Sequence, residues 1–336
     1  MENLKAGEKP QEYSVLTFTW GKYKDFAFTS REKKRHITWL RIYVIVFGLA
    51  GAVFGLLCQL AGHSIDCCQV HQFSYACYTL RWLYSGICFG FISANCIPKI
   101  FGVLSAFSIG LSMYFSMEVL KNDEAQSWIR TRSAAEFLKS ESYKFATGIP
   151  PYNIDEDKTE ILMDKTEKMI HTVEDIPCKI LPEDKKSDKI PTPNLTVDQY
   201  IDVRVNDQIN DYYQKNVNDY IRKINSAKNW SAIVSIFGIF LGALGFTGWT
   251  AGWVALSTTI TASISGYIYA NRFQYLIISY QSTSNRLEVL KNKWYACEKT
   301  DKQRYQFIMD CEEAISIENG SWMAELKNSP KVKING

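Results

Sequence analysis

Six cysteines and two histidines gather in the first third of the chain, and such a group of thiols and imidazoles can bind a metal ion or form disulfides. They are Cys58, Cys67, Cys68, Cys77, Cys88 and Cys96, with His63 and His71 between them. The run "CCQVHQFSYAC" lacks the paired spacing of zinc sites. A disulfide from Cys77 to Cys67 or Cys68 is the better prediction if residues 62–81 face an oxidising exterior, and free thiols are the default otherwise.

Small hydroxyl side chains recur every three or four residues in two apolar segments. Such a stripe either forms hydrogen bonds to a neighbouring helix or lines the wall of a narrow, wet pore, and the first is the plainer interpretation. The candidate pore-lining residues are Ser105, Ser108, Ser112 and Ser116 in the first segment and Ser257, Thr261 and Ser265 in the second. The firmly assigned apolar segments contain no charged residue at their middle, which argues against an ion-coupled transporter.

Glycines four residues apart allow two helices to approach closely. Three such pairs lie in apolar sequence: Gly51 with Gly55, Gly86 with Gly90, and Gly238 with Gly242. These pairs join helices either within one chain or between chains, and packing within the chain is the simpler prediction.

The closing segment "CEEAISIENGSWMAELKN" places Cys311, Ile315 and Trp322 on one stripe of a helix, and Glu318 falls on the same stripe. We expect Glu318 to form a partly buried contact with Arg286, Lys291 or Lys293, which would lock the closing helix against the preceding one. The alternative is a solvated Glu318 in a helix that breaks at Gly320.

The sequence offers little for catalysis. It shows no phosphate-binding glycine loop, no dinucleotide-binding glycine pattern, no paired-histidine zinc helix and no nucleophile elbow, and it has four histidines. We therefore predict no enzyme, no metal and no cofactor. The formal net charge of +3 and the pI near 8.2 do not suggest nucleic acid as a partner.

Two regions are apolar enough to cross a bilayer. Residues 229–271 contain no Asp, Glu, Lys or Arg, over about twice the roughly 20 residues that one helix needs, which predicts a hairpin of two spans. The turn is expected near "FTGW", 246–249. In the other region, residues 42–65 predict a firm span. Residues 82–117 are either one proline-kinked helix or a re-entrant segment followed by a span, and we prefer one net crossing.

This arrangement places the basic runs on one side of the membrane, which is the cytoplasmic side. They are Arg31–His36, Arg130 with Arg132, Arg222 with Lys223, and Arg272 with Arg286. Residues 1–20 lack the basic and apolar regions of a signal peptide. The prediction is an all-α membrane protein with two transmembrane hairpins, about four spans, long cytoplasmic helices and both termini in the cytoplasm.

Between the hairpins, residues 153–194 form a polar linker that we expect to be solvated, with one short helix over 160–171. Thr196 and Gln199 then predict a capping box, and Leu195 and Tyr200 flank it. The next helix carries an apolar stripe toward the third span, at Val205, Ile209, Tyr212, Tyr213, Val217, Tyr220 and Ile224. A second stripe continues beyond the fourth span, at Phe273, Leu276, Ile277, Tyr280, Leu287, Leu290 and Trp294.

Both halves of the chain show the same order of elements, and "AEFLK" at 135–139 corresponds to "LEVLK" at 287–291. We interpret them as two copies of one two-span repeat. The predicted divisions are an N-terminal cytoplasmic segment (1–37), the first repeat with its helical extension (38–152), the polar linker (153–194), the second repeat (195–328) and a tail (329–336).

Three strings of the second half resemble the SLATT family, the SMODS- and SLOG-associating two-transmembrane effector domains of bacterial conflict systems. They are "YIDVRVNDQINDYYQK" (200–215), "YQSTSNRLEVLKNKW" (280–294) and "EEAISIENGSW" (312–322). In the first half, "WIRTRSAAEFLKSESYKFATGIPPY" (128–152) resembles the first repeat of tandem members. None of these strings is catalytic.

The resemblance implies a bacterial inner-membrane effector that disturbs the membrane when an upstream sensor detects infection. The expected partners are the lipid bilayer, further copies of the chain and a nucleotide-signalling or sensor protein of the same system. The alternative is a membrane-anchored helical scaffold without a pore that recruits a cytoplasmic partner.

Overall fold

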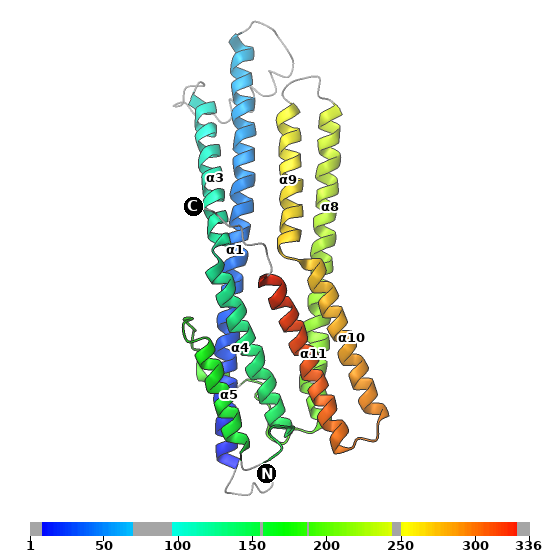
Figure 1. The fold of residues 1–336 in the computed structure, drawn as a ribbon. Coiled ribbons are helices and arrows are strands. Elements are labelled where there is room, and N and C mark those ends of the chain that lie inside the picture. Colours follow the sequence, from blue (N-terminus) through cyan, green and yellow to red (C-terminus); the bar gives the residue numbers. More distant parts are fainter. Residues whose placement is uncertain (1–8, 70–95, 155–156, 187, 244–249, 328–336) are drawn as a thin grey trace. The chain divides into compact units, whose positions relative to one another are not determined.

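The computed structural model describes residues 9–69, 96–154, 157–186, 188–243 and 250–327. Within these ranges it does not describe the side chains of 9–11, 63–69, 122, 250 and 318–327. Every regular element in this part of the chain is a helix, as the sequence predicted (Figure 1). In chain order the helices are α1 (Lys9–Gln69), α3 (Ile97–Leu120), α4 (Asn122–Thr147), α5 (Lys158–Thr172), α6 (Glu183–Lys186), α7 (Val197–Tyr200), η2 (Ile201–Gln214), α8 (Lys215–Ala243), α9 (Thr250–Ala270), α10 (Phe273–Ala296) and α11 (Asp301–Lys327).

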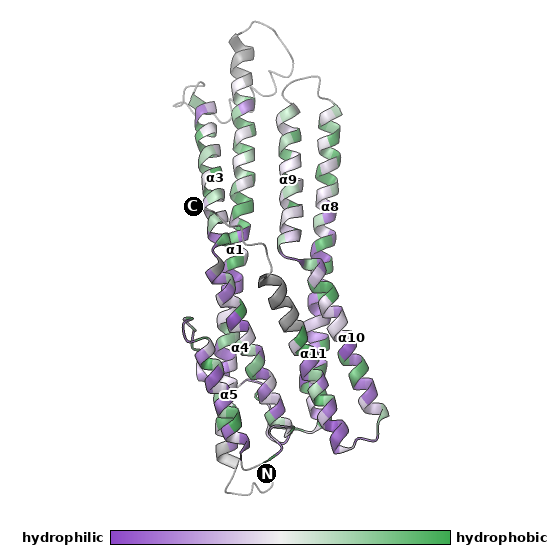
Figure 2. Ribbon diagram, viewed as in Figure 1, coloured by the Kyte–Doolittle hydropathy of each residue, from purple (hydrophilic) through white to green (hydrophobic). Residues whose placement is uncertain are grey.

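The helices group into two compact units, each built from separate stretches of sequence. The polar unit comprises residues 1–36, 122–221 and 274–336, and the apolar unit comprises residues 37–121 and 222–273. The colouring by hydropathy follows this division, because the described helices of the apolar unit are mainly green to white and those of the polar unit are mixed with strong purple (Figure 2). Each sequence repeat therefore contributes helices to both units.

In the polar unit, the start of α1 packs with α4 and α5 around an apolar core. One cluster holds Phe26, Ala134, Ala135, Leu138, Val173 and Ile176, and another holds Leu16, Phe145, Tyr152 and Leu162. The predicted short helix is present as α5. The expectation that 153–194 is a solvated linker is wrong for part of it, because Leu162, Val173 and Ile176 are buried in these clusters, whereas Ile154 and Ile180 are exposed.

The predicted capping box is present at Thr196, whose hydroxyl accepts a hydrogen bond from the Gln199 amide at 3.3 Å, while the Gln199 side chain accepts one from the Thr196 amide at 3.0 Å. The backbone amides of Thr196 and Gln199 are thereby both hydrogen-bonded. The next fourteen residues form the π-helix η2, where the sequence predicted an α-helix. Its buried positions Ile201, Val205 and Ile209 recur every four residues, a longer step than the 3.6 residues of an α-helical turn.

The apolar stripe of α10 is buried at Phe273, Leu276, Tyr280, Leu287 and Trp294, as predicted. It does not continue an unbroken fourth span, however. Helix α9 ends at Ala270 and α10 begins at Phe273, because Arg272 adopts a left-handed conformation with φ 50° that cannot continue a right-handed helix. The Arg41 guanidinium donates to the Ala270 carbonyl at 3.3 Å and helps to satisfy this helix end.

The structure adds a detail to the two-repeat interpretation. Thr131 in α4 and Thr283 in α10 are both buried, and each donates its hydroxyl to the carbonyl of the serine four residues earlier, at 2.8 and 3.0 Å. Trp128 and Tyr280 occupy the corresponding positions three residues before each threonine, and both are buried. The segments around "AEFLK" and "LEVLK" therefore share local structure beyond the three residues that are identical in these strings.

Among the described residues, two helices are long and apolar enough to cross a membrane, at Glu12–Gly62 and Ile97–Leu120. The prediction of about four spans thus stays a prediction. Helix α3 begins at Ile97 with Pro98 in its first turn, where the missing amide hydrogen breaks no helical hydrogen bond. Residues 82–95 of the ambiguous segment and the turn at 246–249 lie outside the described residues.

Candidate functional site

A buried ion pair joins the beginning of the second repeat to the closing helix. Arg204 of η2 donates from Nε and Nη2 to the two carboxylate oxygens of Glu312 in α11, at 2.9 and 2.8 Å. Both side chains are only 1% exposed. Tyr200 at the end of α7 donates its hydroxyl to the same carboxylate at 2.9 Å. This forked geometry is the strong form of an arginine–carboxylate contact.

The surroundings keep both partners charged. Burial disfavours the ionised form of Glu312, but the Arg204 charge and the hydrogen bonds from Arg204 and Tyr200 outweigh it and lower the pKa of Glu312. Arg204 also lies over the ring of Tyr143, 5.0 Å from its centroid. Burial, together with the nearby Arg204 charge, lowers the pKa of Lys139 to about 8. The pair is therefore the centre of a charged cluster inside the polar unit.

Sequence reasoning missed this pair, although the signal was present. Arg204 lies among the buried residues Ile201, Val205 and Gln208, and Glu312 lies between the buried Ile308 and Ile315. A charged residue on an otherwise buried stripe indicates a buried partner. The partners are 108 residues apart, so periodicity finds each one without showing that they meet.

The predicted contact of Glu318 stays a prediction. Glu318 and Trp322 lie in α11, but their side chains are outside the described part of the helix. Arg286 of α10 is exposed, and Lys291 donates to the Asn206 side chain of η2 at 3.1 Å. The role expected of Glu318, a buried carboxylate that fastens α11, is filled by Glu312 six residues earlier.

The hydroxyl stripe of α3 faces α1. None of its four serines is exposed, and Ser108 is buried. Ser105 donates to the Gly51 carbonyl and Ser112 to the Val44 carbonyl, both at 2.8 Å. The glycine pair contributes to this close approach, since a Cβ built on Gly51 would lie 2.7 Å from Ile109 Cγ1 and one on Gly55 3.4 Å from Ser105 Oγ. Here the hydroxyls bind one helix to another.

The stripe of α9 is arranged differently. Ser257 is buried and donates to the Trp253 carbonyl of its own helix at 2.9 Å. A Cβ built on Gly238 of α8 would lie 3.0 Å from Ser257 Cβ, whereas one on Gly242 would make an ordinary contact with Val254, at 3.8 Å. Along the helix, Thr261 is half-buried and Ser265 is exposed, so this stripe runs from a helix contact to the surface of the unit.

The cysteine predictions fall outside the described side chains, since Cys67, Cys68 and Cys77 are not among them. The cysteines that the structure describes are free thiols at Cys58, Cys96, Cys178, Cys297 and Cys311. Among the described residues, no three His, Cys, Asp or Glu side chains group closely enough to hold a metal ion.

Two family models match the chain. Residues 200–322 match the model described as SMODS and SLOG-associating 2TM effector domain 1. The second half of the chain therefore carries a SLATT domain. Residues 23–160 match a second model, described as Protein of unknown function (DUF4231). Together, the two matches support a two-unit SLATT-family architecture. No curated protein and no solved structure matches the chain.

The matched range of the SLATT domain includes both partners of the buried ion pair and the hydroxyl stripe of α9. The α3 stripe and its hydrogen bonds to α1 lie within the DUF4231 match. Each matched range thus contains one pair of helices of the apolar unit together with the polar helices that flank it.

Proposed function

We propose that the chain is a multi-pass effector of a bacterial inner membrane, which oligomerises and makes the membrane permeable when a cytoplasmic signal rearranges its polar unit. The exposed apolar faces of the apolar unit carry this proposal. In the most apolar stretch of α3, only 6% of the residues are buried. In the most apolar stretch of α1, 17% of the residues are buried. Contiguous apolar surface of this kind is rare on soluble monomers and marks a membrane or protein interface.

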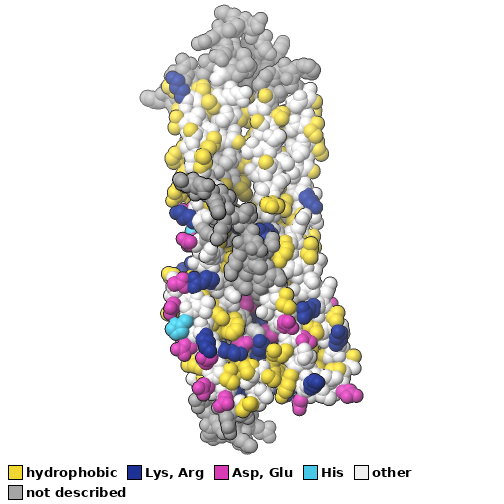
Figure 3. Space-filling model, viewed as in Figure 1, with side chains coloured by type: hydrophobic (Ala, Val, Ile, Leu, Met, Phe, Trp, Pro, Cys, Tyr) yellow, Lys and Arg dark blue, Asp and Glu magenta, His cyan; other side chains and the backbone are white. Residues whose placement is uncertain are grey.

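The same property extends to the second helix pair. Ile236, Ile239 and Phe240 of α8 are 67%, 73% and 60% exposed. In the view of Figure 3, the helices of the apolar unit carry apolar side chains with few charged ones, whereas blue and magenta side chains are interspersed with yellow ones on the described helices of the polar unit. A bilayer would remove the apolar faces from water, which favours four spans even though two helices reach the length and hydropathy of a span.

The topology that we propose has both termini and the polar unit in the cytoplasm, following the basic residues that flank the apolar segments. The test is a single cysteine placed in the linker, for example Asp184→Cys at an exposed position, in an otherwise cysteine-free chain. A membrane-impermeant thiol reagent should label it in broken cells only. Labelling in intact cells would place the linker outside and refute the topology.

Leakage of ions or dye from liposomes that contain the purified chain tests the activity. If the α9 stripe lines a pore, Thr261→Leu makes a narrow wall apolar and excludes water and ions. It should abolish leakage without changing expression or oligomer size, and Ser112→Leu should do the same if both repeats contribute. Ile239→Leu, at an exposed position of α8, should leak like the wild type. Unchanged leakage in Thr261→Leu would exclude this stripe as the pore wall.

One observation favours the second candidate, a membrane-anchored scaffold without a pore. Ser105 and Ser112 use their hydroxyls on the backbone of α1, so this stripe binds helices together within the chain. A wild-type protein that never releases dye, even with its genomic neighbours supplied, would support the scaffold.

A further inference from the structure

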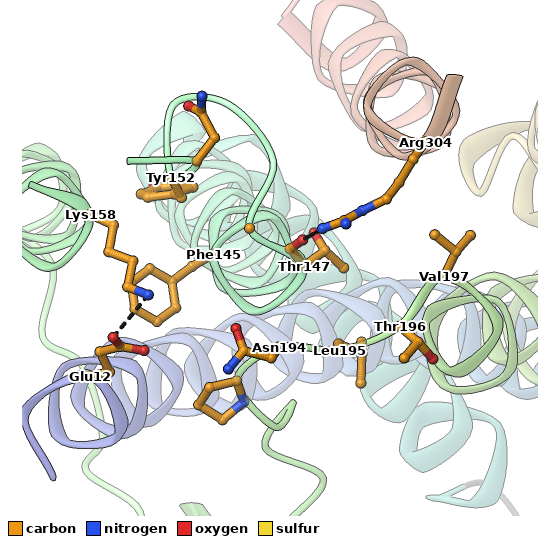
Figure 4. Close-up of a pocket in the computed structure, with 13 residues that line it drawn as sticks. Glu12, Phe145, Thr147, Tyr152, Lys158, Asn194, Leu195, Thr196, Val197 and Arg304 are labelled. Carbon is orange, nitrogen blue, oxygen red and sulfur yellow. Dashed lines mark hydrogen bonds and ion pairs between the residues drawn. The ribbon is translucent and has the colours of Figure 1, made fainter. Parts of the chain in front are cut away.

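A cavity of about 400 Å³ lies inside the polar unit, where five segments of the chain meet (Figure 4). Its volume is within the range of small-molecule sites, roughly 300–1,000 Å³. The segments are the start of α1, the end of α4 with the following turn, the start of α5, the chain before α7, and the first turn of α11. The residues that the argument uses are Glu12, Gly148, Lys158, Asn194, Thr196 and Arg304.

Among the described residues, the charged side chains that line this cavity are two cations and one carboxylate. Lys158 and Arg304 enter from opposite sides in Figure 4. Lys158 pairs with Glu12 at 2.9 Å. Arg304 donates from Nη2 to the backbone carbonyl of Thr147 at 2.5 Å, and no described carboxylate lies within ion-pair distance of it. The lining therefore carries an excess positive charge on the Arg304 side.

The start of one helix adds to this positive potential. Helix α5 begins at Lys158, which lines the cavity, and its N-cap residue Asp157 makes no side-chain hydrogen bond to the helix amides. The N-terminus of a helix carries a partial positive charge, so the backbone at the start of α5 favours an anion beside Lys158.

The backbone keeps the space beside Arg304 open. Gly148 ends α4 with φ +64°, and a Cβ built on it would lie 3.9 Å from Arg304 Nη2. Glycine adopts this left-handed conformation without strain and leaves no side chain in the cavity. Asn194 also lines the cavity and also has a positive φ, 62°.

From this combination, we propose that the cavity binds a small anion that carries phosphate groups, with Arg304 and Lys158 as the cationic ligands. Arginine binds phosphate oxygens through paired N–H donors, and the volume exceeds that of a single phosphate group. Because the walls come from both repeats and from the linker, the bound anion would hold these helices together. The idea that the bound anion triggers the effector rests on the proposed function, whereas the binding of the anion in the cavity is independent of it.

The test uses the full chain in detergent and inorganic pyrophosphate as the probe. Unfolding is followed by tryptophan fluorescence at constant ionic strength, with sodium chloride as the reference salt. A ligand that binds the folded state raises the unfolding midpoint in a saturable way. We expect a saturable rise of several degrees for the wild type, and no rise with pyrophosphate would overturn the proposal.

Three variants make the test specific. Arg304→Gln should abolish the rise, and so should Asn194→Asp, which adds a negative charge at a position where aspartate tolerates the backbone conformation. The control is Lys302→Gln, an exposed position of the same helix that does not line the cavity, and it should respond like the wild type. An unchanged rise in both Arg304→Gln and Asn194→Asp would overturn the site. Binding without liposome leakage would contradict the proposed function and leave the site intact.

Discussion

The polar unit and the apolar unit use different interactions to hold their helices together. In the polar unit, a buried salt bridge and hydrogen bonds between distant side chains fix η2 and α11. In the apolar unit, α1 and α3 approach through Gly51 and Gly55, and the hydroxyls of Ser105 and Ser112 bind backbone carbonyls. Removing one partner of a buried ion pair costs several kcal/mol, whereas hydrogen bonds between membrane helices average well under 1 kcal/mol.

This difference suits a protein in which one part responds and the other part is acted on. A unit held by a few strong, specific contacts has discrete arrangements, because breaking one of them is a large step in free energy. Helices that touch through small residues and weak hydrogen bonds can slide or separate at a lower cost. In the proposed function, the signal therefore acts on the polar unit and the apolar unit follows.

The largest expected effect comes from breaking the ion pair. Glu312→Gln leaves the buried Arg204 charge without its counter-charge and should lower the free energy of unfolding by roughly 3–5 kcal/mol. Chemical denaturation of the purified chain, followed by tryptophan fluorescence, measures this loss. The matched control is Glu313→Gln, since the adjacent Glu313 is exposed, and its effect should stay within about 0.5 kcal/mol. Equal losses in both variants would contradict the assigned role of Glu312.

The pH dependence of stability follows from the same pair. Its partners lower the pKa of Glu312 in the folded state, while the unfolded value is about 4.3. Above that value both states are ionised and the full stabilisation is present. As the pH falls below it, the unfolded state takes up a proton first, so stability decreases toward the lower folded pKa.

The comparison that isolates this effect uses the double variant Arg204→Met with Glu312→Leu, which replaces the pair by apolar side chains. Its unfolding midpoint should fall less than that of the wild type between about pH 5 and about pH 3. If the unfolding midpoints of the two proteins fall equally between these pH values, other carboxylates determine the loss of stability in acid.

A smaller effect is expected where helices of the apolar unit approach most closely. In Gly51→Val the added side chain meets Ile109 Cγ1 and the Ser105 carbonyl, and such overpacking costs roughly 1–3 kcal/mol. Gly110→Val is the control, because nothing lies within 4 Å of a Cβ built there. Both variants change the same residue type within a helix, so their difference in thermal unfolding in detergent reports the α1–α3 contact. A Gly110→Val protein that is equally destabilised would contradict this contact.

The sequence predicted the features that depend on local pattern. The capping box at Thr196, the buried stripe from Val205 to Ile224 and the helix α5 are all present. Each follows from spacing within a few turns of helix. Two serines of the α3 stripe, Ser105 and Ser112, donate to backbone carbonyls of α1, which agrees with the plainer of its two interpretations, and the pore stays a prediction.

What the sequence did not predict depends on contacts between distant segments. The Arg204–Glu312 pair joins two helices that periodicity treats separately. The linker was expected to be solvated because its composition is polar, yet Leu162 and Val173 are buried against other helices. The end of α9 at Ala270 depends on one left-handed residue, Arg272, which is not a residue type that indicates a helix end. The composition of a segment therefore does not show which of its residues are buried, because burial depends on the helices that pack against the segment.

The smallest expected effect concerns the serine hydroxyls of α3. Ser105→Ala removes the hydrogen bond to the Gly51 carbonyl while keeping the volume nearly unchanged, and the loss should be about 0.6 kcal/mol. Ser112→Ala removes the equivalent bond to Val44 and should cost about the same. Because the two sites lie about two helical turns apart, the losses should add in the double variant. Thermal unfolding in detergent, with Ser265→Ala of the exposed end of the α9 stripe as the control, measures these values.

The same double variant also sharpens the contrast between the two stripes. If the α3 serines only bind helices together, the double variant should leak from liposomes like the wild type, since alanine preserves the helix contact and about 1 kcal/mol does not unfold the unit. Leakage that disappears in this variant, at unchanged oligomer size, would mean that the hydroxyls contact water in the active assembly. The α3 stripe would then belong to a pore wall, and the hydrogen bonds to Gly51 and Val44 would describe a closed state.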